Sequence, residues 1–133
     1  MSEIITDKLT GKTSAGDVTI TSEGGAVTMQ LQQGVVKAWV NYTSITTTSI
    51  RDSLNTTSLT DISTGKTTVT FSNAMANTSY SCPTACSNGD ATSTASNLDP
   101  HTFLAGSINF NSFGNTTLID RNFNLVSFLG DLA

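Results

Sequence analysis

The chain has 133 residues with a net charge of −4 at pH 7, so it has room for one ordinary domain and a short additional segment. Its 24 Thr, 17 Ser and 11 Asn residues favour strands and turns, which argues against an all-helical fold. The six basic residues are scattered singly, and no apolar run reaches the roughly 20 residues that cross a bilayer. We therefore predict neither nucleic-acid binding nor membrane insertion.

The first 33 residues contain no aromatic side chain and carry two short alternating segments, 17–21 and 27–31, around Gly24 and Gly25. In each segment the apolar residues fall on one face of a strand. A hairpin with so few apolar side chains cannot form its own core, so it needs other chains to pack against. We predict that residues 1–33 form an extended N-terminal arm, with three copies wound into a stem; a disordered leader is the alternative. The first residues also lack the basic and apolar regions of a secretory signal.

Residues 34–133 contain all the aromatic residues and show repeated strand patterns. Val36, Ala38, Val40 and Tyr42 alternate with residues that include Trp39, which is expected to cover the second face of that strand. Further strands are expected at 46–53, 56–61, 67–72, 78–82, around Ile108 and Phe110, and at 123–129. Residues 83–102 lack periodicity and are expected to form a long loop. Seven or eight short strands predict an all-β head with a β-sandwich or jelly-roll-like fold.

Two cysteines, Cys82 and Cys86, lie four positions apart next to and within this expected loop. Three interpretations stay open for them: reduced thiols, a short-range disulfide, or ligands of a metal completed by His101 with Asp90 or Asp99. Zinc sites commonly use paired and tighter cysteine spacings, and this spacing stands alone. We predict no metal site and no cofactor.

No motif in the chain indicates catalysis. Gly11-Lys12-Thr13 and Gly65-Lys66-Thr67 resemble the end of a phosphate-binding loop, but neither has the glycine that the loop requires five residues earlier. His101 is the only histidine, and no GxSxG sequence accompanies it. We predict that the protein is not an enzyme and has no catalytic residues.

Several pieces between residues 35 and 82 resemble a known family. They are KAWVNY at 37–42, IRDSLN at 50–55, TGKTTVTF at 64–71 and NTSY at 77–80. In order and spacing they are similar to a repeat family of virion proteins from marine and cyanobacterial phages, whose members read approximately KAWVNF, IRDSFN, GTGDYTVNF and NANY. The resemblance implies a β-rich domain of a tail fibre or another virion appendage, usually trimeric.

These observations lead to one main expectation and two alternatives. The main expectation is a small trimeric phage tail fibre or appendage that contributes to host-surface adsorption and uses residues 1–33 to bind another virion structural protein. It would assemble in the host cytoplasm, reach the outside by lysis and function in the virion. The first alternative is a capsid decoration or head-fibre protein. A polysaccharide-cleaving tailspike fragment is disfavoured, because the chain is too short for a long β-helix.

The best candidate for receptor binding is the segment 80–101, because binding residues concentrate on long irregular loops. We expect Tyr80, Asn88, Asp90 and His101 to contact the receptor. A host surface glycan is one candidate ligand for such polar and ring side chains. The alternative is that this composition only reflects an ordinary solvent-exposed β surface.

Overall fold

The computed structural model describes residues 4–12, 18–21, 24–25, 27–89 and 96–133, and the described chain is all-β, as the sequence predicts. No helix in this part of the chain is long and apolar enough to span a membrane. Its strands are β1 Thr19–Thr21, β2 Thr28–Gln30, β3 Ala38–Thr43, β4 Ser49–Leu54, β5 Thr56–Ser63, β6 Lys66–Phe71, β7 Thr84–Ser87, β8 Ser96–His101, β9 Ser107–Gly114, β10 Thr117–Leu118 and β11 Phe123–Phe128. The chain divides into two compact units, residues 1–35 and 36–133, which are described separately.

The first unit contains a two-stranded antiparallel ribbon of β1 and β2. Ile20 lies opposite Met29, and the Leu31 amide donates a hydrogen bond of 2.7 Å to the Val18 carbonyl. Because side chains alternate across a strand, this register places Val18, Ile20, Met29 and Leu31 on one face, as the alternation predicts. Ile20 is 47% exposed and Met29 is 52% exposed, so the ribbon does not bury its apolar face within the described chain. The packing of this ribbon against other chains stays a prediction.

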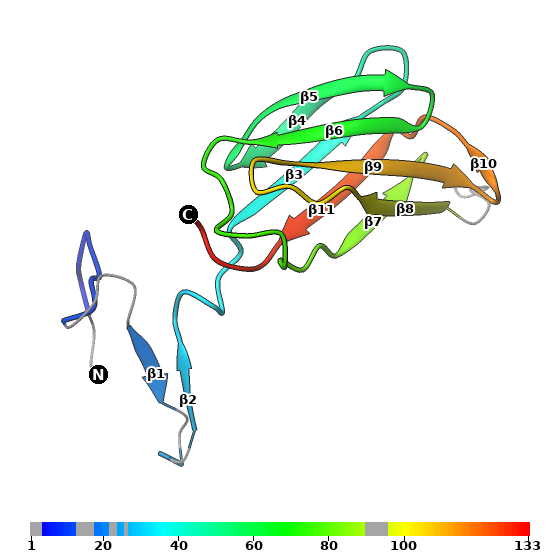
Figure 1. The fold of residues 1–133 in the computed structure, drawn as a ribbon. Helices are drawn as coiled ribbons and strands as arrows, with labels where there is room; N and C mark the ends of the chain where they lie inside the picture. Colours follow the sequence, from blue (N-terminus) through cyan, green and yellow to red (C-terminus); the bar gives the residue numbers. More distant parts are fainter. Residues whose placement is uncertain (1–3, 13–17, 22–23, 26, 90–95) are drawn as a thin grey trace. The chain divides into compact units, whose positions relative to one another are not determined.

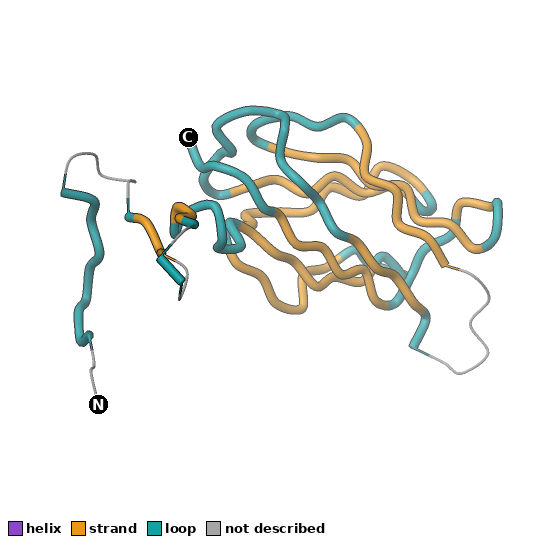
Figure 2. Tube along the Cα trace, turned by 90° about the horizontal axis from the view of Figure 1, so that it is seen from below, coloured by secondary structure: helices purple, strands orange, loops and turns teal. Residues whose placement is uncertain are grey.

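The second unit consists of two antiparallel sheets (Figure 1). One has the order β4-β3-β11-β7. In the other, β9 lies at the centre, paired with β6 on one side and β8 on the other; β5 extends the sheet beyond β6, and β10 pairs with the end of β9. The view from below in Figure 2 shows the strands of this unit as two layers. This arrangement agrees with the predicted β-sandwich.

The core lies between the two sheets and is built from the inward-facing residues of β3, β6, β9 and β11. These strands alternate buried and partly exposed positions, as the sequence pattern predicts. Phe128 of β11 is completely buried and packs edge-on against Phe71 of β6, with 4.8 Å between the ring centroids. Phe110 of β9 also packs against Phe128, at 6.4 Å. Aromatic contacts thus connect one sheet to the other.

Two polar contacts join the sheets at their edges. Between β4 and β5, Asn55 has a φ of 55° and bonds to the backbone of Asn73, donating to its carbonyl at 3.0 Å and accepting from its amide at 2.7 Å. Asn tolerates the left-handed conformation better than most residues, so it suits this crossing. At the other edge, the Thr84 hydroxyl on β7 donates to the Leu98 carbonyl on β8 at 2.7 Å.

Two sequence predictions about residues 78–102 are wrong. The expected long loop contains β7, which pairs with β11, and β8, which pairs with β9. The expected strand at 78–82 is only an isolated bridge between Ser81 and Leu129. Neither β7 nor β8 has strong periodicity of its own; their pairing partners make them strands. Pro100 is tolerated in β8 because that strand lies at the sheet edge.

Candidate functional site

Of the predicted receptor-binding residues, the three that the structure describes, Tyr80, Asn88 and His101, do not assemble into a surface site. Tyr80 is only 6% exposed, and its ring packs against Phe71 and Phe128. Its hydroxyl donates to the Leu104 carbonyl at 3.1 Å, and burial raises the pKa of Tyr80 to about 12. The prediction for Tyr80 is wrong because this side chain completes the core instead of facing solvent.

Asn88 and His101 contact different parts of the domain. Asn88 follows β7, and its carbonyl accepts a hydrogen bond of 3.4 Å from the Asn122 amide, whereas His101 is the last residue of β8. The His101 ring is not a free loop side chain: Nδ1 lies 2.9 Å from the Thr102 hydroxyl, and Nε2 lies 3.2 Å from Oδ1 of Asn111. Asp90 lies outside the described residues. Asn88 and His101 share no contact partner, so they do not form one site.

The two cysteines are free and face the core. Ser81 lies opposite Leu129 and Ser87 lies opposite Phe123, so the chain from 81 to 87 runs extended in one register beside β11. Residues four apart on an extended chain are separated by about 13 Å, beyond the roughly 7 Å that a disulfide tolerates. Burial raises the pKa of Cys82 to about 12, which keeps its thiol protonated at neutral pH. Within the described ranges, no cluster of three His, Cys, Asp or Glu side chains is suited to a metal.

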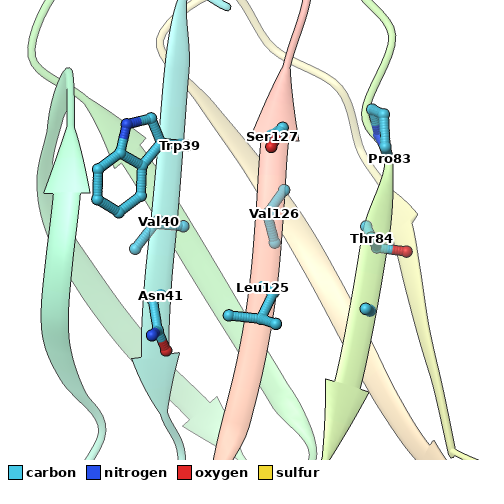
Figure 3. A pocket seen from close by; sticks show the side chains of 9 residues that line it. Trp39, Val40, Asn41, Pro83, Thr84, Leu125, Val126 and Ser127 are labelled. Carbon is cyan, nitrogen blue, oxygen red and sulfur yellow. The ribbon is translucent and has the colours of Figure 1, made fainter.

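The surface feature best suited to binding is a hollow of about 450 Å³ on the outer face of the β4-β3-β11-β7 sheet, which we call the outer-face groove (Figure 3). Figure 3 shows that its walls and floor come from three adjacent strands, β3, β11 and β7. It is lined by Trp39, Val40, Asn41, Pro83, Thr84, Ala85, Leu125, Val126 and Ser127.

Strand register explains why a hollow forms here. Trp39 on β3 lies opposite Ser127 on β11, and Leu125 lies opposite Ala85 on β7. On the side toward β7, each large side chain therefore faces a small one across the sheet, which leaves space above the backbone there. The Val126 side chain belongs to the core and is 4% exposed, so this residue contributes mainly its backbone to the floor of the groove.

The chemistry of the groove suits binding better than catalysis. None of its lining side chains carries a charge, a thiol or an imidazole. Trp39 provides an aromatic surface, Asn41 an amide and Ser127 a hydroxyl. Oδ1 of Asn41 is buried and has no hydrogen-bond partner within the described chain. Such an acceptor is uncommon in native proteins and needs a physical explanation.

Sequence analysis found only one side of the groove. The alternation around Trp39 correctly predicts that its side chain covers the outer face of β3. The sequence does not predict the opposite side, Pro83 to Ala85, because the lack of periodicity there indicates a loop. The available signal was the run of small residues after Tyr80, which has significance only once β7 is known to pair with β11.

Comparisons with protein-family models, with curated proteins and with solved structures find no match to this chain.

Proposed function

We propose that this protein is a structural, non-catalytic component of a phage virion: a small trimeric tail fibre or appendage that contributes to host-surface adsorption. Two observations support the proposal: the resemblance of residues 35–82 to phage virion repeats, and the exposed apolar face of the β1–β2 ribbon. The ribbon face carries the argument, because within a single described chain its apolar side chains remain in contact with water.

Association of several copies removes these apolar side chains from water. Complete burial of one aliphatic side chain contributes about 1.5–3 kcal/mol, so burying Ile20, Met29 and their neighbours in three copies supplies a substantial driving force. A two-stranded ribbon alone is at best marginally stable, whereas copies wound about an axis bury the apolar faces at the centre. In this arrangement residues 1–33 form the stem and also hold the attachment to a neighbouring virion protein. The 34–133 domain is then the part presented to the host.

A matched pair of variants tests the assembly. We expect native mass spectrometry of the full chain to show a trimer, and Ile20→Asp with Met29→Asp to dissociate it. The control is Thr19→Asp with Gln30→Asp, the adjacent cross-strand pair on the polar face of the same ribbon, which adds the same charge. A wild-type chain that is monomeric while the 36–133 unit is folded would overturn the trimer.

Location on the particle tests the function. Labelled antibodies on purified virions, viewed by electron microscopy, are expected to mark the tail or its appendages. Label over the capsid would instead support a decoration or head-fibre protein, which needs the same arm and β-domain. Absence of label from intact particles would overturn both assignments.

A further inference from the structure

We infer that the outer-face groove is a binding site for a neutral glycan, with a sugar ring stacked on the Trp39 indole. The inference deepens the proposed adsorption function by naming the ligand class and the residues that contact it. It places the binding surface on the outer face of the β4-β3-β11-β7 sheet, and of the segment 80–101 only residues 83–85 belong to it.

The size and position of the groove fit an extended ligand. Its volume of about 450 Å³ lies within the roughly 300–1,000 Å³ of typical small-ligand sites. Because it lies on the outer face of a sheet, strands form its floor and the side chains that they carry form its sides (Figure 3). A chain of sugar rings can therefore lie across the sheet without having to enter an enclosed cavity.

Trp39 supplies the main apolar contact. Its side chain is half-buried, and its neighbours toward β7, Ser127 and then Pro83, are small, whereas Leu54 lies opposite it on β4. The face of an indole ring carries partial negative charge, which attracts the weakly positive C–H bonds on the flat face of a pyranose. Pro83 and Ala85 form the facing wall at a distance set by the intervening β11.

The polar groups of the groove match sugar hydroxyls. Oδ1 of Asn41 lacks a hydrogen-bond partner within the described chain, and a ligand hydroxyl is the kind of donor that would supply one. Figure 3 shows the Leu125 side chain reaching from β11 toward β3; it is 44% exposed and therefore has room to turn away from Asn41. The Ser127 hydroxyl offers a further donor and acceptor on the same face.

Charge and area distinguish this ligand from other occupants. The lining has no charged side chain, so an anionic polysaccharide gains no ion pair there. A self-association surface needs about 800 Å² from each partner. Among the described residues on this sheet face, only Leu54 and Leu125 are strongly exposed large aliphatic residues, which is too little apolar surface for such an interface. A neutral glycan needs only the aromatic ring, the amide and the hydroxyl.

The chain has a built-in reporter, because Trp39 is its only tryptophan. We would titrate the full-length protein with maltohexaose, chitohexaose and mannohexaose, following Trp39 fluorescence, with hexagalacturonate as the anionic comparison. The expected result is a saturable change with at least one neutral oligosaccharide and a weaker response to the anion. Asn41→Leu is expected to weaken binding at least tenfold, and Ala85→Leu to abolish it by filling the groove. Ile62→Ser, at an exposed position on the other sheet, is the control that should bind normally.

Three results would overturn the inference. They are no saturable change with any neutral oligosaccharide, equal binding by folded Ala85→Leu protein, or a fluorescence change that follows protein concentration alone, which would identify a self-contact. Urea unfolding of each variant checks that it is folded. Because the titration needs no virion, its failure is separate from that of the proposed function: label at the tail without binding rejects only the glycan site, and binding without label rejects only the virion assignment.

Discussion

Replacing Phe128 by Ala tests whether the aromatic cluster holds the two sheets together. Phe128 is completely buried, and its ring lies 4.8 Å from Phe71 and 6.1 Å from Tyr80 between centroids. Truncation of a core Phe lowers the free energy of unfolding by about 3–5 kcal/mol, because the transfer energy is lost and a cavity remains. A domain of this size has about 5–15 kcal/mol in total, so the variant should be close to unfolding. Leu125 lies on the outer face of the same strand and is 44% exposed. Leu125→Ala should therefore lower the free energy of unfolding by only about 1 kcal/mol.

The assay is urea unfolding at equilibrium, followed by Trp39 fluorescence and by far-ultraviolet circular dichroism. We expect coincident transitions, an unchanged dependence on urea concentration and a midpoint for Phe128→Ala far below that for Leu125→Ala. Equal losses for the two variants would refute the assignment of inner and outer faces on β11. A loss below about 1 kcal/mol for Phe128→Ala would refute the aromatic cluster as the link between the sheets.

Three further predictions follow from local geometry. At Gly65, φ is 70°, and an added Cβ would lie 2.7 Å from the Ile119 nitrogen and 2.8 Å from the Ser112 carbonyl oxygen, so Gly65→Ala should lower the urea midpoint strongly. Gly106 has open space around it, so Gly106→Ala should leave the midpoint nearly unchanged. Asn55→Ala should lower the free energy of unfolding by about 1–3 kcal/mol, because it loses the hydrogen bonds to Asn73 and must still adopt a positive φ. Asn55→Gly should lower it by less in the same urea titration, because Gly accepts that φ. Burial raises the pKa of Cys82 from 9.0 to about 12, so the folded state keeps a proton that the unfolded state loses, and stability should fall as pH rises from 9 toward 12. The urea midpoint should then change less between about pH 8 and about pH 10.5 in Cys82→Ala than in wild type. An equal change in both proteins would contradict the assignment of Cys82 as a buried, protonated thiol.

The sequence predicts the strands whose own side chains alternate. Ala38, Val40 and Tyr42 on β3, and Val69 and Phe71 on β6, are spaced two apart and are all buried, as expected. For such strands the hydrophobic period of two is local information, since it requires only that one face meets a core. The same reasoning correctly places the apolar residues of the β1–β2 ribbon on one face.

The sequence fails where a strand depends on its neighbour. The residues of β7 and β8 have little alternation, and they are extended because β11 and β9 offer unpaired backbone groups beside them. The same limit affects the candidate site. An irregular segment after residue 79 predicts Tyr80 at the surface, although it closes the core, and leaves open a disulfide between Cys82 and Cys86 that the extended chain forbids.

Composition and periodicity by themselves determined that this chain is a β protein with an aromatic core after residue 34 and an apolar ribbon before it. Both follow from which side chains the chain carries and how they alternate. Only the tertiary structure decided that Trp39 faces Ser127 and that Leu125 faces Ala85, because these pairs join residues far apart in sequence through the register of separate strands. The outer-face groove exists through that register alone.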